Sequence, residues 1–86
     1  MFYLYKLKQI KEKFELGVVT AFHLRTEKIG DTWRGKLFIE FNGTRKGKPA
    51  ILQYHSRFAN LDTIKNLVEP YKGQFECDYL NIWHRK

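Results

Sequence analysis

Basic and aromatic side chains alternate along residues 33–41, and this spacing is the strongest sign of binding chemistry in the sequence. Arg34, Lys36 and Phe38 occupy every second position, so in a β-strand they project from one face of the sheet. Cations contact phosphates, and an exposed ring stacks on a nucleobase with about 1–3 kcal/mol per base. The pattern predicts a sheet face that grips single-stranded nucleic acid. In the alternative interpretation, Phe38 packs under the N-terminal segment and the cations face water.

Further basic residues fall on the segments expected beside this strand, among them His23 and His55. The glycines of segment 42–49 predict a loop that is mobile enough to close on a phosphate backbone. We expect one continuous positive strip along this loop and the strand face. The predicted nucleic-acid-binding residues are Arg25, Arg34, Lys36, Phe38, Arg45, Lys46, Lys48 and Arg57.

Residues suited to catalysis or metal binding are present, but their spacing matches no familiar site. The histidines are far apart in the sequence: His23, His55 and His84. Without a cysteine pair or a close Cys-His spacing, no zinc site is expected. The three aspartates that a hydrolase would use fall at a turn, a helix start and a strand: Asp31, Asp62 and Asp78. We therefore expect no enzyme activity, no metal and no cofactor.

The composition narrows the class of partner. The 86-residue chain has 16 Lys and Arg and a net charge of +7, which attracts polyanions. Nucleic acid is the favoured partner, with an acidic protein partner or simple solubility as alternatives. The single cysteine, Cys77, forms no internal disulfide and is predicted to be a small buried residue in a strand. No apolar run is long enough to span a bilayer, so a cytoplasmic location without membrane contact is expected.

Alternating apolar residues define most of the expected strands. They predict strands over residues 17–28, 33–41 and 50–57, with the first two joined as an antiparallel hairpin through the Gly30-Asp31 turn. A last strand begins at Phe75, and its apolar pattern changes parity near Leu80, which a β-bulge would explain.

One helix is clearly indicated over residues 60–69. Asn60 or Asp62 caps it, an apolar stripe follows, and Pro70 stops it. Residues 6–15 fit either a short helix or a long bent strand. A single α+β, mainly β domain over residues 1–86 is therefore expected, as a small curled antiparallel sheet or an OB-like barrel, in which a helix separates the third and fourth strands.

The two ends of the chain have less definite roles. The tail from Ile82 to Lys86 is either an anchor to a partner or a frayed terminus. The lysines of residues 6–13 are interpreted mostly as a solvated face.

The sequence as a whole predicts a non-catalytic protein that binds single-stranded DNA or RNA without reading base sequence. Its small size and basic charge are typical of an accessory subunit of a replication or processing complex from a phage or other mobile element. One alternative is an interaction module or inhibitor that binds a larger nucleic-acid enzyme through an aromatic surface. A small ribonuclease toxin is a weaker one.

Overall fold

Two long antiparallel strands run through the centre of the molecule. The computed structural model describes residues 3–86, and in it β2 (Val19–Ile29) pairs with β3 (Thr32–Arg45) through the Gly30-Asp31 turn. The predicted hairpin is confirmed. Gly30 has a φ of +62°, a conformation that glycine adopts without steric cost.

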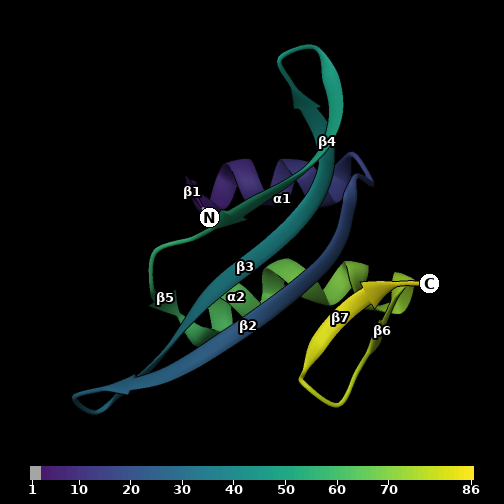
Figure 1. The fold of residues 1–86 in the computed structure, drawn as a ribbon. Helices are drawn as coiled ribbons and strands as arrows, with labels where there is room; N and C mark the ends of the chain where they lie inside the picture. The colour runs from purple at the N-terminus through teal and green to yellow at the C-terminus, as the bar shows by residue number, and fades with distance from the viewer. Residues whose placement is uncertain (1–2) are drawn as a thin grey trace.

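The segment predicted as a basic loop is instead the end of a second hairpin. β3 runs to Arg45, and β4 (Lys48–His55) pairs with it from Arg45↔Lys48 to Phe38↔His55. Only Lys46 and Gly47 form the turn, with φ values of +52° and +76°. Two positive φ values match the twist of a two-residue hairpin, so the expected mobile loop is wrong. We call this end of the β3–β4 hairpin, residues 45–48, the arm. The arm and the β2–β3 turn lie at opposite ends of the molecule (Figure 1).

A bulge interrupts the ladder on β3 after His55. The chain leaves the ladder at residues 56–58 and returns as β5 (Ala59–Asn60), which pairs Ala59 with Gly35. Between the pairs His55↔Phe38 and Ala59↔Gly35, three residues (56–58) oppose two on β3 (36 and 37), and one extra residue is the mark of a β-bulge. Arg57, which was predicted to belong to a strand over residues 50–57, therefore lies outside β4.

The C-terminal segment is a second small hairpin rather than one bulged strand. β6 (Phe75–Cys77) pairs with β7 (Ile82–Arg85), and β7 also pairs with β2. Asp78 Oδ1 accepts hydrogen bonds from the N–H groups of Leu80 and Ile82, which folds the turn. This turn, rather than a β-bulge, explains why the apolar pattern changes parity near Leu80. The tail is thus part of the sheet, and the predicted burial of Cys77 is wrong, because this residue is exposed.

The N-terminal segment supplies the other edge of the sheet. β1 (Tyr3–Leu4) pairs with β4 in parallel, and α1 (Leu7–Glu15) follows it with Lys6 as its N-cap, so the helical alternative for residues 6–15 is confirmed. The strand order is β1-β4-β3-β2-β7-β6, with β5 beside β3. The mainly β, α+β fold is confirmed. An OB-like barrel is wrong, because β1 and β6 add to opposite sides of the sheet and leave it open.

The second helix follows its sequence signals closely. α2 (Leu61–Val68) begins after Asn60, whose side chain accepts hydrogen bonds from the N–H groups of Asp62 and Thr63. A 3-10 turn, η1 (Glu69–Gln74), contains Pro70 and leads into β6.

Both helices pack on one face of the sheet and form the core. The buried cluster joins residues of α1 and α2 to inward residues of the central strands, and it comprises Ile10, Phe14, Val19, Phe22, Leu37, Ile39, Phe41, Ile64, Val68 and Phe75. Because side chains alternate along a strand, the intervening residues of β2, β3 and β4 belong to the face opposite the helices.

Candidate nucleic-acid interface

The face opposite the helices carries a row of three rings across three strands. His23, Phe38 and His55 are register partners on β2, β3 and β4. Their ring centres lie 6.1 Å (His23 to Phe38) and 5.7 Å (Phe38 to His55) apart. Phe38 is half-buried, and it does not pack under α1, because Ile10 and Phe14 of α1 lie in the core on the other side. We call these three residues the ring row.

Backbone carbonyls orient both histidines of the ring row. His23 Nδ1 lies 3.2 Å from the carbonyl oxygen of Asn81, and His55 Nδ1 lies 2.8 Å from that of Ser56. A carbonyl oxygen only accepts, so Nδ1 carries the proton in each ring. In the neutral form Nε2 is then the acceptor.

Lys36 connects the ring row to a further aromatic residue. Its Nζ lies 5.6 Å from the ring centre of Phe38 and 5.4 Å from that of Phe58. These distances are typical of cation–π contacts. The register also places Arg25 opposite Lys36, and Arg34 opposite Glu27, so Arg25, Arg34, Lys36 and Phe38 share the face as predicted.

The other end of the face is acidic and hydrogen-bonded. Glu40 Oε1 accepts from Gln53 at 2.9 Å, and Asp78 Oδ2 lies 2.9 Å from His84 Nε2. The pKa of Asp78 is held below its usual value, above all by the hydrogen bond from the Ile82 N–H and also by His84 and the Leu80 N–H. His23 and His84 both line a hollow of about 140 Å³. The face is therefore cationic near Lys36 and acidic near Glu40.

The three basic residues of the arm are separated from this face. Arg45 and Lys48 are register partners with the parity of Phe41 and Leu52, which is the parity of the helix side. Arg45 lines a surface pocket with Tyr3, Tyr5 and Tyr54, and Lys46 is in the turn. The expected continuous positive strip is wrong, because strand alternation divides it between two faces.

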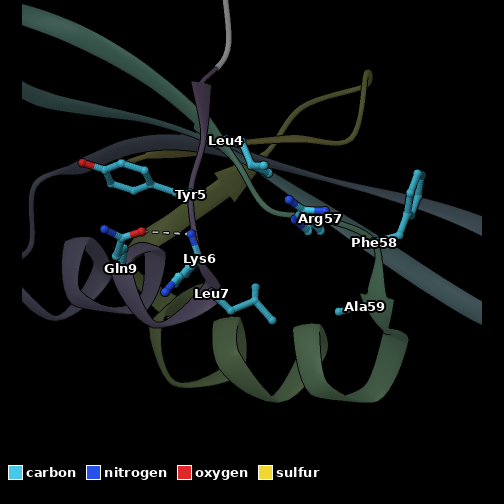
Figure 2. A pocket seen from close by; sticks show the side chains of 8 residues that line it. All are labelled: Leu4, Tyr5, Lys6, Leu7, Gln9, Arg57, Phe58 and Ala59. Atoms are coloured by element: carbon cyan, nitrogen blue, oxygen red, sulfur yellow. Dashed lines mark hydrogen bonds between the residues drawn. The ribbon is translucent and has the colours of Figure 1, made fainter.

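A pocket lies where the bulge meets the N-terminal segment (Figure 2). It has a volume of about 460 Å³. Residues from β1, α1 and the bulge line it: Leu4, Tyr5, Lys6, Leu7, Gln9, Arg57, Phe58 and Ala59. In Figure 2, Arg57 lies between Leu4 and Phe58, and Leu7 projects toward Ala59. We call this cavity the bulge pocket.

No pattern in the sequence pointed to Phe58 or Lys6 as a site residue. Phe58 follows the end of a predicted strand, and only the bulge brings it to Lys36. Lys6 looked like one of several solvated lysines. The pairing of β1 with β4, which brings Lys6 to the same pocket as Arg57, has no local sequence signal.

Comparisons with known proteins add no functional assignment. No family model, curated protein or solved structure matches the chain. In residues 3–86, three or more potential metal ligands do not gather in one place. The helices within this range are also too short or too polar to cross a membrane.

Proposed function

We propose that the protein binds single-stranded nucleic acid on the sheet face opposite the helices, as an accessory subunit of a nucleic-acid-processing complex. The observation that supports this most is the ring row, with Lys36 held between Phe38 and Phe58. Rings on an open sheet face stack two or three bases of a single strand. Stacking tolerates any base, so the expected binding has little sequence preference.

The charges near the ring row suit the phosphate backbone. Arg25, Arg34 and Lys36 lie on the same half of the face as Phe58, and cations beside stacking rings make the usual surface for single strands. The acidic end around Glu40 and Asp78 would repel phosphates. A bound oligonucleotide is therefore expected to run from the ring row toward Phe58.

Salt dependence of oligonucleotide binding tests the proposal. Fluorescence anisotropy with a labelled 12-mer measures affinity across a salt series. Lys36→Gln is expected to reduce the slope of log affinity against log salt by about 0.7, the value for one phosphate contact on a single strand. Lys65→Gln, an exposed change on α2, is the matched control and should leave the slope unchanged.

A change at the ring row separates stacking from charge. Phe38→Leu keeps an apolar side chain but removes the ring, and we expect a loss of about 1–3 kcal/mol in binding. Thermal unfolding of the same variant shows whether the fold is intact. Equal affinity of the wild type, Phe38→Leu and Lys36→Gln proteins for the 12-mer would refute the proposed face.

A protein partner is the second candidate, and the β6–β7 turn favours it. Tyr79 is 91% exposed and Leu80 is 56% exposed, although such side chains are large and apolar. Aromatic residues are enriched in protein interfaces. If a partner binds here, Tyr79→Ser should abolish its capture from a nuclease-treated lysate, while oligonucleotide binding remains.

A further inference from the structure

The bulge pocket is built by two segments that are distant in the sequence. One wall is the β1–α1 junction, and Gln9 Oε1 holds its first helical turn by accepting from the Lys6 N–H at 3.0 Å. The other wall is the bulge, where buried Ser56 bonds to Leu37 of β3. Both walls are thus fixed by hydrogen bonds within the protein.

The lining has the chemistry of a site for an apolar ligand with an anionic end. Leu4, Leu7 and Ala59 supply aliphatic surface. The charged lining residues, Lys6 and Arg57, are both cations. The volume of about 460 Å³ lies in the range typical of small-ligand pockets, which is about 300–1,000 Å³.

Phe58 makes the pocket continuous with the proposed binding face. Its ring lines the pocket and also lies 5.4 Å from Lys36 Nζ, which in turn contacts Phe38. An oligonucleotide that stacks on the ring row and passes Lys36 therefore reaches the pocket at its end.

We propose that the bulge pocket receives the terminal nucleotide of the bound single strand and that Arg57 and Lys6 hold its terminal phosphate. The inference rests on the proposed function and adds a preference for phosphorylated ends. A terminal phosphate carries more charge than an internal phosphodiester, and arginine binds phosphate through paired hydrogen bonds. The base would lie against the aliphatic wall and the Phe58 ring.

Three internally labelled 12-mers of one sequence test this inference: one with a 5′-phosphate, one with a 3′-phosphate and one with hydroxyl groups at both ends. For the wild-type protein, a phosphate at one end is expected to raise affinity about tenfold, as hydrogen bonds between charged groups do. Arg57→Gln and Lys6→Gln should each remove most of this gain, so that each variant binds the phosphorylated and the hydroxyl 12-mers with nearly equal affinity.

Matched variants and folding controls keep the test specific. Arg45→Gln removes an exposed arginine of the arm that does not line the bulge pocket, and should keep the tenfold gain. Arg57 is exposed, and its backbone oxygen, not its side chain, accepts the hydrogen bond from Ser56. Arg57→Gln is therefore expected to fold, which thermal unfolding would verify.

The possible outcomes separate this inference from the proposed function. If all three 12-mers bind equally, the terminal-phosphate site is wrong and the binding face stands. If none of the three 12-mers binds, both the terminal-phosphate site and the proposed binding face are wrong. If a peptide ending in an apolar residue with a free carboxylate displaces the phosphorylated 12-mer better than a nucleoside monophosphate does, the pocket takes a peptide and the inference is overturned.

Discussion

Ser56 and Leu37 form a closed pair of hydrogen bonds across the bulge. The Ser56 N–H donates to the Leu37 carbonyl at 2.8 Å, and the Leu37 N–H donates to Ser56 Oγ at 2.9 Å. Ser56 is fully buried, and its hydroxyl donates in turn to the Arg57 carbonyl. One side chain thus replaces the strand partner that the bulge removes from β3.

We predict that Ser56→Ala destabilises the protein, because it leaves the Leu37 N–H buried without its acceptor. The expected loss is about 1–3 kcal/mol in the free energy of unfolding, measured by urea denaturation. Thr44→Ala, an exposed change on the same β3 strand, should stay within about 0.5 kcal/mol. Similar values for both variants would show that the hydroxyl is not needed.

A second prediction concerns the closest approach of α2 to the sheet. A Cβ at Gly35 would lie 3.0 Å from Leu24 Cδ1, 3.1 Å from Leu61 Cδ1 and 3.4 Å from Ile64 Cγ1. Gly35→Ala is therefore expected to overpack this site and to lower stability by about 1–3 kcal/mol. At Gly73 an added Cβ meets no atom within 4 Å, so Gly73→Ala should be neutral or stabilise by about 0.4–1 kcal/mol.

The carboxylate of Asp78 should make stability depend on pH on the acid side. Its pKa is lowered in the folded protein, chiefly by the Ile82 N–H. A lowered folded-state pKa contributes stability above the unfolded-state pKa of about 4, and this contribution is lost as the pH falls through the folded-state value. Asp78→Asn should therefore lower Tm at neutral pH, and the difference from the wild type should shrink below pH 4.

A second variant shows which hydrogen bond causes this dependence. His84→Gln keeps both backbone hydrogen bonds to Asp78 and should retain most of it. If the Tm difference between the wild type and Asp78→Asn is the same at pH 3 and pH 7, the explanation is wrong.

The arm charges should affect the rate of binding more than the bound complex. Arg45 and Lys48 point away from the ring row, so charge reversal of Arg45, Lys46 and Lys48 to Glu is expected to slow association by weakening long-range attraction. Stopped-flow measurements should show an association rate at least about tenfold lower at low salt. The dissociation rate should change little, and a large increase would place the arm in the complex.

The sequence was sufficient to predict the elements whose structure depends on neighbouring residues. The Gly30-Asp31 turn between two alternating segments predicted the β2–β3 pairing, and the alternation over residues 33–41 predicted which residues share a face. Asn60 predicted the start of α2 because its cap uses only neighbouring N–H groups. The same local rule placed Arg34 and Lys36 together on the candidate face.

The predictions failed where distant residues determine the geometry. Residues 42–49 have the composition of a loop, but pairing with β4 extends β3 through them. Cys77 has the alternation of a buried strand residue, yet β6 is an edge strand with little packed over it. The bulge pocket needs β1 beside β4, a pairing between Tyr3 and Tyr54 that local periodicity does not report.

The parallel pairing of β1 with β4 sets an order for folding during synthesis. Tyr3 leaves the ribosome long before its partner Tyr54, so β1 remains unpaired while the β2–β3 hairpin forms by local contacts. Closing so long a loop costs chain entropy, and such contacts form late. The wall of the bulge pocket that includes Leu4 is then assembled only after β4 has emerged, so an incompletely synthesised chain has the central hairpin before it has the pocket.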